Sequence, residues 1–218
     1  MSDRWMKKGM HMMRAFMSLI KEKDTGEYIE SLLTYFAAPT IQGLKPGSLI
    51  NLRRGGDDGI VAAWCSRKEE LLRKFRVEAL ALSSRVMPND SAMLLMLYKK
   101  GHLARALFSE KAVSILNPLG YEKCIPCVDA CLERLKARFM ETREMRERFL
   151  FPHEIGLFLG YPPEDVEGFI RDKGKSPLAV GYWKVYGNVR RARRTFRIFR
   201  RAEHRAVRSI IRREQSLL

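Results

Sequence analysis

The sequence predicts an α+β fold, a mostly helical single domain with a small, largely covered sheet of about three short strands and a long basic C-terminal helix. Three observations support this prediction. Apolar residues recur through most of the chain at the three- and four-residue spacings of amphipathic helices. Only a few short stretches have strand length or alternation. Residues 189–218 combine helical spacing with a dense series of arginines.

Composition sets the broad class of protein. A chain of 218 residues with 46% hydrophobic residues can bury a substantial core, which excludes a disordered chain. No apolar run approaches the roughly 20 residues of a membrane-spanning helix, and the N-terminal segment lacks a signal-peptide cleavage pattern. We therefore expect a cytoplasmic protein with reduced cysteines. The formal charge of +16 is concentrated, because residues 189–218 contribute +9 of it.

The first part of the chain predicts two helices and a strand. Residues 4–22 form an amphipathic, methionine-rich helix that we expect to pack on the core, and residues 28–37 form a second helix. Residues 38–47 are expected to be a loop whose last residues make an ordinary turn. Residues 48–52 then form a strand, and residues 54–59 a polar turn.

The middle of the chain predicts three helices around one buried strand. Ser66 is a suitable N-cap, and Glu69 three residues later completes a capping box, which predicts a helix over residues 69–86. Residues 92–98 are an uninterrupted apolar run bounded by turn residues, as expected for a buried central strand. Helices are predicted at 101–116, before an Asn-Pro pair and a glycine, and at 128–148.

Three cysteines have a spacing found in metal sites. Cys124, Cys127 and Cys131 form the sequence CIPCVDAC, with gaps that zinc and iron–sulfur sites use. Such sites usually need four ligands, and the fourth would have to come from a distant cysteine or histidine. Buried or partly exposed thiols are the simpler interpretation, and the metal site is the alternative.

Residues 151–170 predict two short helices that meet at a glycine turn. Pro152 suits the first turn of a helix, and Gly160 suits the left-handed residue that ends it. This spacing also fits a helix-turn-helix. The second helix, however, would present Glu164 and Asp165 to DNA, and these acids repel phosphates. A compact helical corner is the favoured interpretation.

Residues 181–187, GYWKVYG, alternate as a strand does, with an aromatic residue at several positions. Packing against a helix is favoured over stacking on a ligand ring. A pocket in this part of the protein would be lined by His153, Glu154, Tyr161, Trp183, Lys184 and Tyr186. No nucleophile–base constellation or cofactor fingerprint occurs in the sequence, so a non-catalytic role is favoured over an enzyme and no cofactor is predicted.

The basic helix begins at Asn188, a suitable N-cap, and divides the chain into a core domain of residues 1–187 and a helix of residues 188–218. Its length is about 45 Å if unbroken, so it either packs on the core or extends from it. Arginine favours bidentate contacts with phosphate or carboxylate, which predicts a nucleic acid or an acidic protein as partner, with membrane-surface contact unfavoured. The residues predicted to make these contacts are Arg190, Arg191, Arg194, Arg197, Arg201, Arg205, Arg208 and Arg212.

The phrases FPHEIGLFLGYP and GYWKVYG, with the upstream APTIQGLKPGSLINL and LLMLYKKGHL, resemble an uncharacterised bacterial domain-of-unknown-function family, number three-seven-nine-three in that series. The resemblance covers about residues 29–199. It implies no established activity or catalytic residue. It does imply an iron or redox setting as the alternative function, with a flavodoxin-like partner or a cysteine-bound metal. The cysteine cluster and the arginine-rich helix are not hallmarks of that resemblance.

Overall fold

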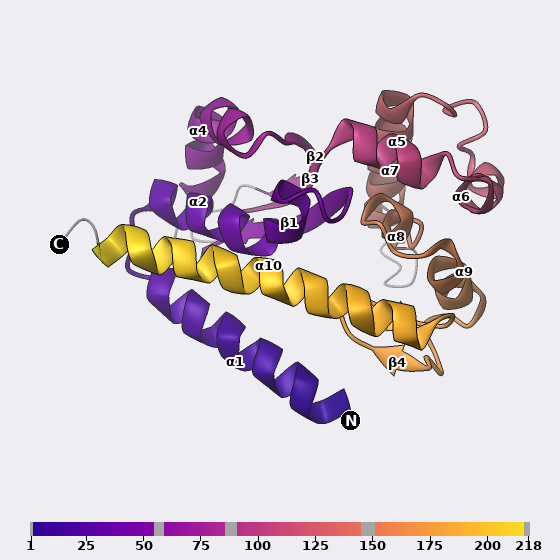
Figure 1. Cartoon of the computed structure of the whole chain (residues 1–218). Coiled ribbons are helices and arrows are strands. Elements are labelled where there is room, and N and C mark those ends of the chain that lie inside the picture. Colours follow the sequence, from indigo (N-terminus) through magenta and orange to yellow (C-terminus); the bar gives the residue numbers. More distant parts are fainter. Residues whose placement is uncertain (1, 55–58, 86–90, 145–150, 216–218) are drawn as a thin grey trace.

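A three-stranded antiparallel sheet lies at the centre of the computed structural model (Figure 1). The structure describes residues 2–54, 59–85, 91–144 and 151–215. The strands β1 (Gly47–Arg53), β2 (Glu78–Arg85) and β3 (Ala92–Tyr98) follow the order β1-β3-β2, so β3 is central. Leu95 pairs with Ile50 on one side and with Ala81 on the other.

Helices make up most of the remaining structure, as the fold class predicted. Those before the last strand of the sheet are α1 (Ser2–Ile20), α2 (Thr25–Phe36), α3 (Ala38–Ile41) and α4 (Ile60–Phe75). Those after it are α5 (Lys100–Leu107), α6 (Glu110–Leu116), the 3-10 helix η1 (Asn117–Leu119), α7 (Val128–Glu144), α8 (Ile155–Phe158), α9 (Pro163–Arg171) and α10 (Val189–Gln215). A two-stranded hairpin of β4 (Ala179–Val180) and β5 (Lys184–Val185) precedes α10.

The central strand β3 is buried on both faces, which explains its uninterrupted apolar sequence. Met93, Leu95 and Leu97 belong to a first core with α1, α2 and α4. Met96 and Tyr98 belong to a second core with α5, α6, α7 and α8. Figure 1 shows these two groups of helices on either side of the sheet. The prediction of a buried central strand at 92–98 is confirmed.

The helix predicted over residues 69–86 is helical as far as Phe75 and wrong from Glu78 to Arg85, where the chain is a strand; residue 86 lies outside the described residues. Helix α4 begins earlier, at Ile60, and Ser66 lies inside it, where its hydroxyl donates to the carbonyl of Ala63. The helix ends at Phe75, the C-cap residue Arg76 has a left-handed φ of 52°, and the chain continues as β2. Pairing with β3 overrides the helix propensity of the Glu, Ala and Leu residues in that segment, because the pairing is a tertiary contact that local sequence does not report.

Smaller differences concern single breaks and turns. The helix predicted at 101–116 is two helices, because the backbone of Ser109 is extended and Ser109 starts α6. Residues 38–41, predicted as loop, form the helical turn α3, and the strand predicted at 181–187 pairs over Lys184 and Val185 alone. The helix predicted at 128–148 is described as far as Glu144, and most of the polar turn at 54–59 lies outside the described residues.

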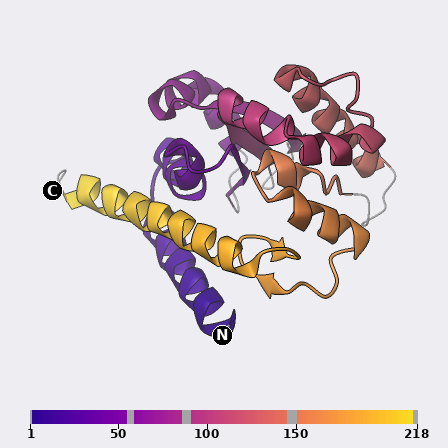
Figure 2. The ribbon, with the colours of Figure 1, turned by 45° about the vertical axis from the view of Figure 1, so that its right-hand side comes forward.

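Helix α10 is packed along the body of the protein (Figure 2). Near its start, Phe199 joins a third core formed with the β4–β5 hairpin. In its middle, Ala202 and Ala206 contact Ala38 of α3, and small side chains on both helices allow this close approach. Near its end, Ile210 belongs to the first core. The helix is therefore docked at three points along its length.

Within the described residues, no helix has the length and apolar character needed to cross a bilayer.

Candidate functional site

Helix α10 begins where the sequence predicted. The side chain of Asn188 accepts a hydrogen bond of 2.9 Å from the backbone N–H of Arg191, which satisfies one of the free N–H groups in the first turn. Asn188 therefore defines where the helix starts, and the helical repeat then sets the direction in which each arginine side chain leaves it.

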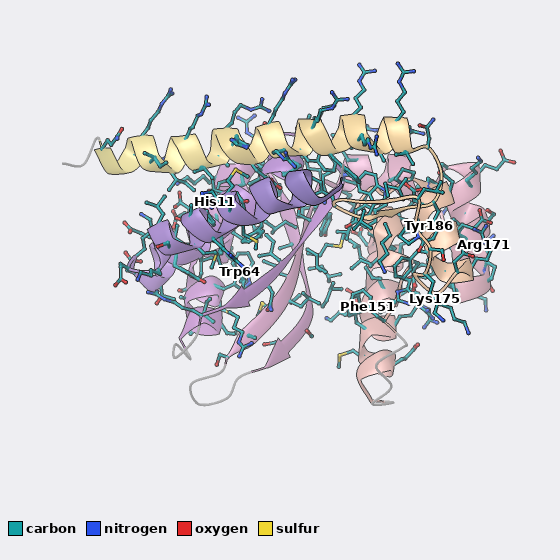
Figure 3. All side chains as sticks on the ribbon, turned by 90° about the horizontal axis from the view of Figure 1, so that it is seen from below. His11, Trp64, Phe151, Arg171, Lys175 and Tyr186 are labelled. Carbon is teal, nitrogen blue, oxygen red and sulfur yellow. The ribbon has the colours of Figure 1, made fainter. Side chains whose placement is uncertain are left out.

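Seven arginines form a nearly straight row along α10, which we call the arginine stripe. Its members are Arg190, Arg194, Arg197, Arg201, Arg205, Arg208 and Arg212. Successive members are three or four residues apart, close to the 3.6-residue helical repeat, so neighbours lie about 5.5 Å apart along the axis and the row is about 33 Å long. Figure 3 shows side chains with nitrogen tips standing away from the outer face of the helix.

The arginine stripe is exposed, and few groups of the protein itself contact its guanidinium groups. All seven side chains are exposed. Arg205 donates to Oε1 of Gln42 at 2.5 and 3.2 Å, and Arg197 contacts the carbonyl of Arg193 at 3.4 Å. In the part of the chain that the structure describes, the other five have no carboxylate within salt-bridge distance. Their guanidinium groups are available for an external anion.

Arg191, which the sequence also placed in the partner-binding set, lies beside the stripe. Its guanidinium is 3.8 Å from the carboxylate of Glu164 on α9, and both side chains are substantially exposed. This contact joins the start of α10 to the helical corner and makes Arg191 less available than the stripe.

Glu203 is the acid of α10 that faces inward. The Tyr182 hydroxyl donates to its Oε2 at 2.7 Å, and burial raises the pKa of Glu203 against the opposing effects of that hydrogen bond, Arg200 and Lys45. The outer face of α10 therefore keeps its full positive charge. Burial also lowers the pKa of Lys45 to about 8, and its Nζ lies 5.6 Å from the centre of the Phe199 ring.

The sequence did not predict this contact between Lys45 and the helix. Lys45 was interpreted as part of an ordinary turn, and the chain does bend at residues 44–46, directly before β1. The signal available in the sequence was the position of Glu203, four residues after Phe199 and seven after Phe196 on the apolar side of the helix.

A second feature is a cavity of about 530 Å³ between α8, α9 and the β4–β5 hairpin. Most of its wall is apolar and aromatic. Of the six residues that the sequence proposed for a pocket, four line this cavity: His153, Tyr161, Trp183 and Lys184.

The other two proposed pocket residues lie elsewhere. Glu154 is buried at the start of α8, where its carboxylate accepts hydrogen bonds from the Tyr121 hydroxyl and the Arg138 guanidinium. Tyr186 packs against Phe169 outside the cavity lining. Glu154 points away from the cavity because its partners come from the segment after η1 and from α7, which its local sequence does not reveal.

Asp165 holds the corner between α9 and the hairpin. Its carboxylate accepts hydrogen bonds from the Trp183 indole at 2.7 Å and from the backbone N–H groups of Tyr186 and Gly187 at 2.8 and 2.7 Å. The first residues of α9 therefore bind the protein's own backbone. Gly160, predicted to end the preceding helix, has a φ of 76°.

The cysteines differ in exposure. Cys131 is buried, which raises the pKa of its thiol to about 12, whereas Cys127 is exposed and Cys124 is half-buried. Among the described residues, no group of three His, Cys, Asp or Glu side chains is placed to hold a metal ion. A metal or iron–sulfur role for these cysteines remains a prediction.

Fold and site together define a protein of the α+β class with a docked helix that carries an exposed row of arginines. The chain belongs to the family described as "Protein of unknown function (DUF3793)", whose model matches residues 33–217. That match includes the whole of α10, so the basic helix is part of the family's domain and the relationship extends past the residues that first suggested it. No curated protein and no solved structure gives a significant match.

Proposed function

We propose that the protein is a non-catalytic binding protein whose arginine stripe holds the phosphate backbone of a nucleic acid. The observation that carries the proposal is the stripe itself, seven exposed arginines in one row on a docked helix. Arginine binds phosphate oxygens in a planar, bidentate manner, and neutralising phosphates releases counterions, which favours binding.

The length of the arginine stripe matches a stretch of nucleic-acid phosphate backbone better than a single small anion. The stripe is about 33 Å long, the rise of roughly ten base pairs at 3.4 Å each. Because Glu203 is turned inward, no described acidic side chain of α10 interrupts the outer face. Packing of Ala202 and Ala206 on Ala38 fixes the helix, so its backbone does not have to become ordered on binding.

Binding is tested with a labelled 20-nucleotide RNA and a DNA duplex by fluorescence anisotropy at several salt concentrations. The test variant replaces with glutamine four stripe residues whose guanidinium groups are available for an external anion: Arg190, Arg194, Arg201 and Arg208. We expect the slope of log K against log salt to become shallower by about 3.6 for the duplex and about 2.8 for the RNA, since each phosphate contact contributes about 0.9 on duplex DNA and about 0.7 on a single strand.

A matched variant controls for net charge. It also replaces four exposed basic residues with glutamine, all away from α10: Lys68, Arg73, Lys111 and Lys136. This control should keep the wild-type affinity and slope. If the two variants lose equal amounts of nucleic-acid affinity, binding depends on net charge alone and the stripe proposal fails. Tighter binding to polyglutamate than to either nucleic acid would instead identify an acidic protein as the partner class.

A further inference from the structure

The cavity between α8, α9 and the hairpin has the size of a small-molecule site. Its volume of about 530 Å³ falls within the roughly 300–1,000 Å³ typical of such sites. It lies in the part of the molecule where Figure 1 shows α8, α9 and β4 together, at the start of α10. Its lining residues come from four segments of the chain, so the folded protein is needed to form it.

Aromatic rings dominate the wall. Phe151, Tyr161, Phe169 and Trp183 all line the cavity, and the Tyr161 and Trp183 rings stack with centroids 4.9 Å apart. The indole of Trp183 is held in place because its N–H donates to Asp165. A rigid aromatic wall favours a planar ring, which can stack without losing many rotatable bonds.

Two polar groups remain available at the cavity. The His153 ring packs 4.8 Å from the Phe169 centroid, and within the described residues its imidazole makes no hydrogen bond or ion pair. Burial lowers the pKa of His153, so the ring is neutral near pH 7 and offers one N–H donor. Lys184 donates to the carbonyl of Gly174 at 2.7 Å and has two further N–H groups.

Asp165, the acid in the lining, does not dominate the local electrostatics. The residue is only 3% exposed, and its carboxylate already accepts three hydrogen bonds from the protein. The Lys184 ammonium, by contrast, lies on an exposed residue at the rim and is free to meet an anionic group. The cavity thus combines an apolar aromatic interior with a cationic rim.

We propose that this cavity binds a planar aromatic carboxylate of about two fused rings, with the ring against Phe169 and Trp183 and the carboxylate at Lys184. His153 supplies a hydrogen bond to a polar group on the ring or to the carboxylate. None of the cavity's lining residues belongs to the arginine stripe, so this proposal does not rest on nucleic-acid binding.

The test uses the full-length protein and 2-naphthoate, with the neutral naphthalene-2-methanol as a matched probe. Saturation-transfer NMR detects contact with each ring, and calorimetry in physiological salt gives the affinity. Lys184→Met should weaken 2-naphthoate by about tenfold, because a charge-assisted hydrogen bond is lost, and should leave the alcohol unchanged.

A blocking variant tests the location. Val180 lines the cavity from β4 and is 40% exposed, so Val180→Trp fills the site without entering the core and should abolish binding of both probes. Leu178→Trp is the control, since Leu178 is 64% exposed and does not line the cavity. Melting temperatures verify folding.

Several results would overturn the proposal. The first is that no saturation passes from the protein to 2-naphthoate at about 1 mM. The second is that Val180→Trp and Leu178→Trp reduce binding equally. The third is that Lys184→Met weakens binding of both probes equally. Loss of 2-naphthoate binding in the four-arginine stripe variant, with Lys184→Met unaffected, would place the carboxylate on α10 and also contradict it. If Val180→Trp fails to fold, the comparison of the two probes on Lys184→Met decides.

Discussion

The Tyr182 hydroxyl donates a 2.7 Å hydrogen bond to Oε2 of Glu203 and thereby joins the hairpin to the middle of α10. Tyr182→Phe should lower the free energy of unfolding by about 1–2 kcal/mol, because it leaves a largely buried carboxylate without this donor. Chemical denaturation measures the change. Glu203→Gln keeps an acceptor for the Tyr182 hydroxyl, so its stability loss is compared with that of Tyr182→Phe. No loss in Tyr182→Phe would show that the contact does not secure α10.

Lys45 should make the free energy of unfolding depend on pH in the alkaline range. Its folded-state pKa is about 8, below the ordinary lysine value of 10.5, because burial disfavours the ammonium ion. Between those values the unfolded chain binds more protons, so the lysine contribution to stability rises with pH. We expect a slope of up to about 1 kcal/mol per pH unit from pH 8 to about 10 that Lys45→Met lacks. If the free energy of unfolding changes with pH by the same amount in wild type and in Lys45→Met from about pH 8 to about 10, the prediction is contradicted.

Two other titrating groups, Glu203 and Tyr161, make stability fall rather than rise with increasing pH. Burial raises the pKa of Glu203, so the native state holds a proton that the unfolded state has released, and stability falls as pH rises from the ordinary glutamate pKa to the raised value. Burial also raises the pKa of Tyr161 to about 12, so stability falls again above about pH 10 as unfolded tyrosines ionise. Comparing wild type with Lys45→Met removes the Tyr161 contribution, which comes from burial alone. It does not remove all of the Glu203 contribution, because Lys45 itself lowers the pKa of Glu203.

Asp165 should be a strong stability determinant of the corner. Asp165→Ala leaves the indole N–H of Trp183 and two backbone N–H groups without their acceptor, which costs about 2–4 kcal/mol. In a double-mutant cycle, Trp183→Phe should lose less when Asp165 is already alanine, since the two share one bond. Strict additivity measured by urea denaturation would rule out that coupling.

Gly160 and Gly101 form a matched pair of glycine substitutions. Gly160 has a φ of 76°, and a Cβ there would lie 2.4 Å from Cδ of Pro46, so Gly160→Ala should destabilise the protein by about 2 kcal/mol or more. Gly101 lies in α5, where an added Cβ would meet no other atom within 4 Å. Gly101→Ala should therefore be neutral or stabilise by up to about 1 kcal/mol, and thermal melts distinguish the two.

Periodicity predicted the elements whose pattern directly reflects burial. The run at 92–98 is apolar throughout because β3 is covered on both faces. Phe196 and Phe199 lie on the apolar side of α10 and are buried, but the sequence left open whether that side packs on the core. Strand β2 escaped prediction because Glu78, Ala79 and Leu80 favour helix locally, and only pairing with β3 makes them a strand.

The site was predictable to the extent that it lies on one element. The arginine stripe follows from spacing along a single helix. The surroundings of Lys45 and Glu154 do not, because Lys45 meets α10 residues far along the chain and Glu154 meets Tyr121 and Arg138. Sequence spacing gives neighbours on one helix, whereas these contacts depend on how separate elements pack.

The far end of α10 is held by an ionic contact with α2. Glu30 accepts hydrogen bonds from Lys74 at 2.8 Å and from Arg213 at 2.9 Å. Burial opposes ionisation of Glu30, but the two cations outweigh it and lower its pKa. The contact therefore stabilises the protein above the ordinary glutamate pKa near 4.3 and is lost as pH falls through the lowered value.

Glu30→Gln should loosen this end of the helix specifically. It leaves Lys74 and Arg213 close together without their carboxylate, and we expect a loss of about 1 kcal/mol in stability, since both cations are partly exposed. Amide exchange should accelerate at residues 207–215 and stay unchanged at residues 192–199, which the third core holds. Arg213→Gln, which keeps the Lys74 contact, should give a smaller effect on the same amides. Uniform acceleration along the whole helix would instead mean that α10 undocks as one unit, and the arginine stripe would then lose its fixed support.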